Sequence, residues 1–168
     1  GASSVVSLDR GIDFLGAGDI TFTGNPGATL EVGGAAITST IGGNLDVSGQ
    51  GTLRLRGSGS KFDIGTHAVV LGADVTFRAN YDTNTATIDA DTGSMIAGSG
   101  TLTWNGSDPF AAGAVVTTGQ DVDVSTSGTT NFNGATFTVN GTWTATGGLI
   151  YGAASFTIAP TGTLRNTS

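Results

Sequence analysis

The sequence predicts an all-β fold, a parallel β-helix (β-solenoid) in which each coil contributes one strand to each of three faces. Three observations predict it: a short alternating phrase that recurs along the chain, breaks rich in glycine and asparagine, and a near absence of the charged helix formers glutamate and lysine. Glutamate and lysine each occur once in 168 residues, although both residue types form helices readily. Self-similarity of this kind is typical of stacked repeat architectures.

The recurring phrase alternates apolar, β-forming residues with small polar ones over four or five positions. Alternation at a period of two predicts a strand with one buried face and one solvated face. The phrase returns roughly every seven to ten residues, as expected of short strands joined by tight corners. Examples lie at 19–23, 44–47, 52–55, 101–104 and 136–139.

The first half of the chain contains ten candidate strands, each centred on apolar residues and bounded by turn formers such as the glycine pairs at 33–34 and 42–43. These strands are expected at 5–6, 12–14, 20–22, 30–32, 36–37, 45–47, 53–55, 62–64, 69–71 and 75–77.

The second half contains eleven more candidates, separated by Asn-Gly and Gly-rich breaks. They are expected at 86–88, 95–96, 102–104, 115–116, 122–124, 132, 137–139, 143–145, 149–151, 156–158 and 164. Pro26 and Pro160 mark corners, because proline cannot donate a hydrogen bond to a ladder.

This number of strands separates the solenoid from the antiparallel sandwich. A sandwich uses fewer, longer strands, with turns every 8–12 residues or so. Three short strands and their corners need roughly 20–25 residues per coil, which gives about seven coils and a rod of about 35 Å at the usual strand spacing. The crossover rule for parallel strands predicts a right-handed coil. Residues 1–168 then form a single solenoid domain, with an irregular loop near 79–91 and a second irregular stretch around Pro109.

Composition limits the classes of partner. The net charge of −7 argues against nucleic acid, which requires basic patches. The sequence has no apolar run of the length that a membrane-spanning helix needs. Cysteine is absent and 38% of residues are hydrophobic, which favours an ordered domain without disulfides. We therefore expect an extracellular or cell-surface location, with no cofactor.

Threonine pairs of the form Thr-x-Thr suggest a surface array. If the pairs stacked on one flat face, they would resemble the ice-binding face of insect antifreeze β-helices, but their spacing is irregular. The simpler interpretation is that threonine is a favourable outward-facing β-branched residue. The pairs begin at Thr21, Thr38, Thr85, Thr101, Thr136, Thr142 and Thr161.

Candidate metal and catalytic residues are few. Asp89 and Asp91 place two carboxylates on the same side of an extended segment, which makes this pair the candidate for Ca²⁺ binding. Pectinase-like β-helix enzymes, which are similar in outline, need clustered aspartates with basic residues on one face, whereas His67 and Lys61 stand alone in this sequence. We therefore expect no enzymatic activity. Trp104 and Trp143 share the inward parity of their strands, so we expect both in the core.

A family likeness rests on Gly-Thr-Leu and Asn-Gly-Thr phrases at 51–53, 100–102, 140–143 and 162–164. These phrases resemble the repetitive passenger regions of bacterial autotransporters and filamentous-haemagglutinin-type surface proteins. The resemblance covers most of the chain and implies a secreted, right-handed β-helix used for adhesion or as a stalk.

The functional hypothesis that follows is a structural or adhesive extracellular protein. Because a β-helix ends in open strand edges, the chain would stack end to end with copies of itself or form part of a longer surface solenoid, with surface glycans as a further partner. The alternatives are a carbohydrate-binding or carbohydrate-degrading β-helix and an ice-binding protein.

Overall fold

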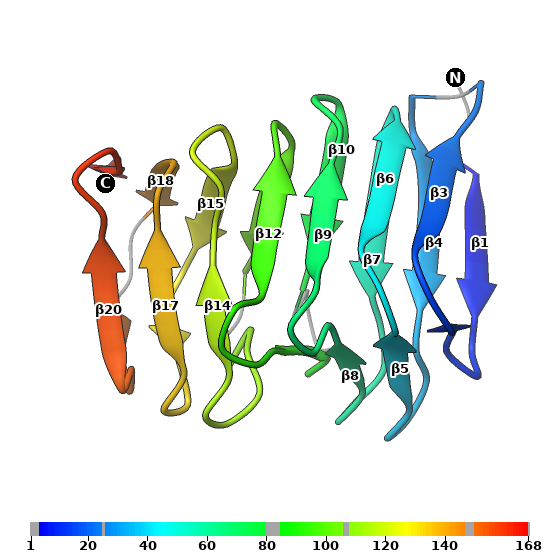
Figure 1. Cartoon of the computed structure of the whole chain (residues 1–168), viewed down its shortest axis with the longest axis horizontal. Helices are drawn as coiled ribbons and strands as arrows, with labels where there is room; N and C mark the ends of the chain where they lie inside the picture. The colour runs from blue at the N-terminus through cyan, green and yellow to red at the C-terminus, as the bar shows by residue number, and fades with distance from the viewer. Residues whose placement is uncertain (1–3, 25, 80–84, 106–107, 147–149, 168) are drawn as a thin grey trace.

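The chain folds as a parallel β-solenoid with three faces, which confirms the predicted fold class. A computed structural model describes residues 4–24, 26–79, 85–105, 108–146 and 150–167. The paired strands in these ranges run parallel to their neighbours, and the ranges contain no helix. In Figure 1 the third-face strands run upward in front and the first-face strands run downward behind, as the chain advances from right to left. The coil is therefore right-handed.

The first face is one continuous sheet of eight strands. Neighbouring strands of this sheet are one coil apart, so the described residues span seven coil steps. The steps differ in length along the chain: the shortest joins Asp123 to Thr142, and the longest joins Thr76 to Thr101. The strands are β1 (Val5–Leu8), β4 (Ala28–Val32), β7 (Gly51–Leu55), β10 (Val75–Arg78), β13 (Thr101–Trp104), β15 (Asp123–Ser127), β18 (Thr142–Thr146) and β21 (Thr163–Asn166).

The second face consists of two short sheets, and the stretch at 108–110 lies between them: Phe110 forms a bridge with Ile88, and Asp108 N–H binds the Asn131 carbonyl. Its strands are β2 (Asp13–Phe14), β5 (Thr38–Ile41), β8 (Lys61–Asp63), β11 (Thr87–Asp89), β16 (Thr130–Asn131) and β19 (Ile150–Tyr151).

The third face is also two sheets joined by one bridge, here between Ile96 and Thr118. Its strands are β3 (Gly18–Phe22), β6 (Leu45–Gly49), β9 (Ala68–Leu71), β12 (Met95–Gly98), β14 (Val115–Thr117), β17 (Thr136–Val139) and β20 (Ser155–Ile158).

The core is a set of apolar columns inside the three faces. Parallel pairing places equivalent residues of successive coils on top of one another, so alternation within each strand becomes a column along the axis. On the first face one inward column contains Leu30, Leu53, Phe77, Leu102, Val124, Trp143 and Leu164. Full burial of a large apolar side chain contributes roughly 1.5–3 kcal/mol, and these columns supply the main stabilisation of the rod.

The structure corrects three local expectations. Ala36 adopts a left-handed φ of 54° in a turn, so the strand expected at 36–37 begins at Thr38. The irregular region near 79–91 is shorter than expected, since Ala79 is buried and β11 occupies 87–89. Residues 80–84 lie outside the described ranges, and so does position 149 of the strand expected at 149–151. The stretch around Pro109 still contributes to the second face, because Phe110 is fully buried and bridges to Ile88.

The C-terminal half of the core is a cluster of aromatic rings. The ring of Trp104 lies with its centroid 5.6 Å from that of Phe110 and 6.1 Å from that of Trp143. Phe132 and Phe137 complete the cluster, and their centroids are 5.4 Å apart. Trp104 and Trp143 are 1% and 0% exposed, which confirms their predicted place in the core.

Each buried indole has a threonine as its hydrogen-bond acceptor. Trp143 Nε1 donates to Thr126 Oγ1 over 2.9 Å, and Trp104 Nε1 donates to Thr130 Oγ1 over 2.9 Å. Both threonines are buried, with 4% and 1% exposure. These inward threonines therefore satisfy N–H groups that would otherwise lack a partner in the dry core.

Replacing Thr126 with valine is expected to lower the free energy of unfolding by about 1–3 kcal/mol, because the indole N–H of Trp143 loses its acceptor while the side-chain shape is retained. Chemical denaturation monitored by tryptophan fluorescence measures the change. The matched control is Ser125→Ala on the same strand, which removes an exposed hydroxyl and should change stability by less than about 0.5 kcal/mol. An equal, small effect of both changes would contradict the inward placement of Thr126.

Candidate functional site

The outer surface of the first face has a column of threonines in register. Successive pairings place these residues one coil apart, at the roughly 4.8 Å spacing of neighbouring strands. We call this set the threonine column: Thr29, Thr52, Thr76, Thr101, Asp123, Thr142 and Thr163, in which Asp123 is the single exception. The column extends over six coil steps of one flat sheet.

A second outward column runs beside the first, two residues further along each strand. We call it the mixed column: Ser7, Glu31, Arg54, Arg78, Thr103, Ser125, Thr144 and Arg165. Its N-terminal half includes charged residues and its C-terminal half is mostly hydroxyl-bearing. The two halves of the first face therefore differ in chemistry.

The charged half of the mixed column is an ion-pair network around Glu31. The Glu31 side chain is 11% exposed and pairs with Arg54, while Arg56 Nη1 lies 3.5 Å from its Oε2. Ser7 Oγ donates to the same oxygen over 2.6 Å. Arg56 also binds Asp9, with 2.7 Å between Nη1 and Oδ1. Sequence analysis did not single out Glu31, whose partners come from the coils on either side of it.

The C-terminal half of the first face forms what we call the hydroxyl patch. It joins parts of the threonine and mixed columns over three coils, and it consists of Thr101, Thr103, Ser125, Thr142 and Thr144. Asp123 lies within it and is exposed. Each hydroxyl can donate one hydrogen bond and accept two, so the patch presents a flat array of donors and acceptors next to threonine methyl groups.

The Gly-Thr-Leu phrases found in the sequence mark the start of the first face. Gly51, Gly100, Gly141 and Gly162 precede the outward threonines of β7, β13, β18 and β21, and the next residue points inward. A methyl group on Gly141 would collide with the backbone carbonyl of Val122 in the coil before it. The phrase therefore encodes one corner of the coil: a tight approach, then an outward threonine and an inward apolar residue.

The Thr-x-Thr pairs do not share one plane. Thr38 and Thr40 lie on the second face and Thr136 and Thr138 on the third. The pairs that begin at Thr101 and Thr142 share the first face, with Asp123 and Ser125 between them. The array of pairs considered for ice binding is thus divided among three faces, whereas the threonine column lies on one face and is interrupted by Asp123.

The proposed calcium ligands Asp89 and Asp91 flank buried Ala90. Asp89 Oδ2 accepts a hydrogen bond from Lys61 Nζ over 3.0 Å, so an ammonium group already neutralises this carboxylate. Asp91 is exposed and uses its backbone N–H to bind the Gly65 carbonyl. Among the described residues no group of three or more metal-ligating side chains occurs. Calcium binding at this pair stays a prediction.

His67 lies in a corner between the second and third faces. Its backbone N–H binds the Ile64 carbonyl over 2.9 Å, and its own carbonyl accepts from Met95 N–H over 3.2 Å. The first bond closes the turn and the second joins it to the next coil, and the residue is half-buried. The positions of His67 and Lys61 do not by themselves define a catalytic group, so the expectation of no enzymatic activity stays a prediction.

No family model, curated protein or solved structure matches this chain. The part of the chain that the structure describes has no helix long and apolar enough to cross a bilayer.

Proposed function

We propose that this chain is a structural and adhesive segment of an extracellular surface protein, in which the solenoid provides length and the first face provides the contact surface. The observation that carries the proposal is the unbroken register of the first face over seven coil steps. Such a stack extends one continuous sheet along a rigid axis. The resemblance to passenger regions supports the same class of protein, because it rests on the phrases that build this face.

The hydroxyl patch is the contact surface that we propose. A flat array of hydroxyl groups and methyl groups matches the surface of a neutral polysaccharide, which is itself rich in hydroxyls. Many weak contacts repeated along a rigid rod add up through multivalency, so an adhesive surface needs little affinity at each position. The low charge of this half of the face avoids the desolvation cost that buried charges would add.

Retention of protein-coated beads on a dextran-coated surface under flow tests the adhesive role. The test variant is the double change Thr101→Arg with Thr142→Arg, which places two long charged side chains across the hydroxyl patch. We expect retention to fall about tenfold, which corresponds to roughly 1.4 kcal/mol of binding free energy.

The matched control is Thr117→Arg with Thr157→Arg. These threonines are also two coil steps apart, but they lie on the third face. The control adds the same charge and should keep the retention of the unchanged chain. Equal losses in both double variants, or no retention of the unchanged chain on dextran, would contradict adhesion through the hydroxyl patch.

A further inference from the structure

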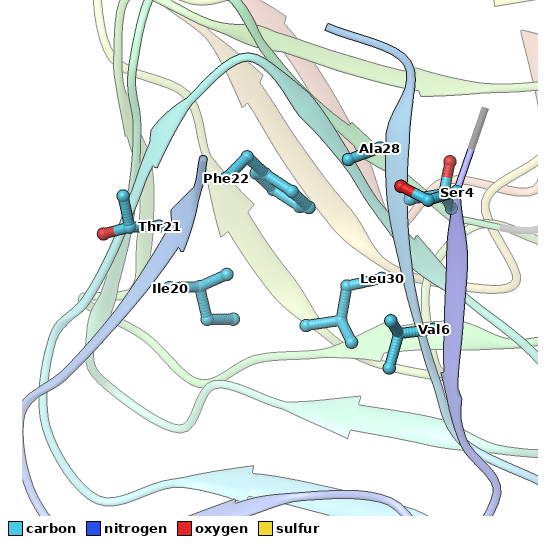
Figure 2. Close-up of a pocket in the computed structure, with 8 residues that line it drawn as sticks. Ser4, Val6, Ile20, Thr21, Phe22, Ala28 and Leu30 are labelled. Carbon is cyan, nitrogen blue, oxygen red and sulfur yellow. The ribbon is translucent and has the colours of Figure 1, made fainter. Parts of the chain in front are cut away.

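The N-terminal end of the solenoid has an open apolar socket. A cavity of about 210 Å³ opens between β1, β3 and β4. In Figure 2 the side chains of Ile20, Phe22, Leu30 and Val6 surround the same space. Val6 is 58% exposed, although it pairs with Leu30 and therefore occupies an inward-facing position of its strand. The core columns therefore begin at a surface that nothing in the described chain covers.

The C-terminal end is uncovered in the same way. Leu164 continues the inward column of Trp143 but is 48% exposed, whereas Trp143 is 0% exposed. Phe156 likewise stacks on fully buried Phe137, yet it is only partly buried itself. The loss of burial follows position along the axis, since these residues have the same parity and the same chemistry as their buried counterparts.

Both ends also present strand edges with unused hydrogen-bonding capacity. On the first face β1 pairs with β4 alone and β21 pairs with β18 alone among the described strands. An open edge of this kind is a template for pairing with another strand. Apolar surface and an unpaired edge thus occur together at each end of the rod.

The charges of the two ends are opposite in sign. The first coil, residues 4–27, contains Asp9, Arg10, Asp13 and Asp19, a net charge of −2. The last coil, residues 147–167, contains Arg165 as its single charged residue. Contact between an N-terminal and a C-terminal end is therefore attractive, whereas contact between two N-terminal ends or two C-terminal ends is repulsive.

We propose that the N-terminal socket docks the C-terminal coil of a second copy of this chain, head to tail. The inference rests on the proposed structural function and identifies a second copy of the chain as the partner of each end. In this contact the exposed Leu164 and the partly buried Phe156 of one copy meet Val6, Ile20 and Phe22 of the next, and parallel strand pairing continues across the junction. Because the two surfaces differ, the contact does not close on itself and it generates an open filament.

Two end-blocking variants test the proposal on the full chain. Val6→Lys places a positive charge in the socket, facing the positive C-terminal coil. Leu164→Lys places a positive charge on the C-terminal end, where docking would bury it against the apolar socket; it has the same sign as the charge of Val6→Lys, so the two blocked ends also repel each other. Both positions are about half exposed in the single chain, so the new charges remain in water until two copies dock. Circular dichroism checks that each variant keeps its β-structure.

Light scattering coupled to size exclusion gives the mass at a series of concentrations. The unchanged chain should form species whose mean mass rises with concentration to several times that of the monomer. Each variant alone should remain a monomer. An equimolar mixture should give a 1:1 dimer and nothing larger, because one free socket then meets one free C-terminal end.

The control variant is Leu15→Lys, which changes a 98% exposed leucine on the same first coil and should assemble like the unchanged chain. Dimers of either blocked variant alone would indicate contacts between like ends and would overturn the head-to-tail arrangement. A concentration-independent monomer of the unchanged chain would overturn the docking proposal altogether. Bead retention on dextran would still report the adhesive role of a single rod, so the two failures are distinguishable.

Discussion

Replacing Trp104 with alanine is expected to lower the free energy of unfolding by about 3–5 kcal/mol, the cost of removing a large buried aromatic side chain. Trp104 is 1% exposed and lies at the centre of the aromatic cluster. Its ring centroid is 6.2 Å from that of Phe132 and 6.0 Å from that of Phe137. The change also leaves the buried hydroxyl of Thr130 without its indole donor.

Equilibrium denaturation in urea measures this loss. Because whole domains are stable by only about 5–15 kcal/mol, the variant should unfold at a much lower urea concentration or fail to fold at room temperature. The matched control is Thr103→Ala, which changes the outward neighbour on the same strand and should cost at most about 1 kcal/mol. Similar losses in the two variants would contradict the inward assignment of Trp104.

Replacing Gly98 with alanine is expected to cost about 2–5 kcal/mol, from two separate sources. Gly98 ends β12 with a left-handed φ of 91°, a conformation that costs other residues about 1–2 kcal/mol. An added methyl group would also collide with the backbone carbonyl oxygen of Leu71 in the coil before it. That carbonyl belongs to a paired strand, so relieving the overlap adds about 1–3 kcal/mol.

Urea denaturation of two other glycine variants separates these sources. Gly93 has a φ of 99° but no neighbouring heavy atom within 4 Å of the added methyl group, so Gly93→Ala should show the conformational cost alone. Gly16 has neither a left-handed φ nor a neighbour within 4 Å, and Gly16→Ala should change stability by less than about 0.5 kcal/mol. Equal costs at Gly98 and Gly93 would mean that successive coils do not approach each other as described.

The parity of individual strands could be predicted from the sequence, because alternation is a local property. Leu102 and Trp104 are separated by an outward threonine, and this alone placed both side chains in the core. The strand around Phe137 was located in the same way. Fold class follows from the same information, since many short strands with tight breaks leave no length for a sandwich.

The columns could not be predicted, because register depends on the length of every corner. The coil step from Asp123 to Thr142 is shorter than the step from Thr76 to Thr101, so no fixed interval reveals which threonines stack. The Thr-x-Thr pattern also describes two residues within one strand, whereas the column takes one residue from each coil. The Gly-Thr-Leu phrases did contain the missing information, since their threonines all belong to the threonine column.

The ion-pair network of Glu31 escaped prediction for the same reason. Its partner Arg54 is distant in sequence but directly opposite in register. The turn at Ala36 is a different case, because alanine rarely adopts a left-handed φ and nothing in its immediate neighbours indicates one. Tertiary packing against the next coil decides that conformation: Ala36 N–H binds the Ser58 carbonyl over 2.9 Å.

Pulsed electron–electron spin resonance between labels on the threonine column tests the coil register most directly. One label replaces Thr29, and the second replaces Thr101, Thr142 or Thr163, which lie three, five and six coil steps away. The solenoid predicts mean separations that rise in proportion to the number of steps, to about 14, 24 and 29 Å at roughly 4.8 Å per strand. Separations that do not increase in this order, as antiparallel strands in two facing layers would produce, would contradict the stacked-coil structure and the end-to-end assembly built on it.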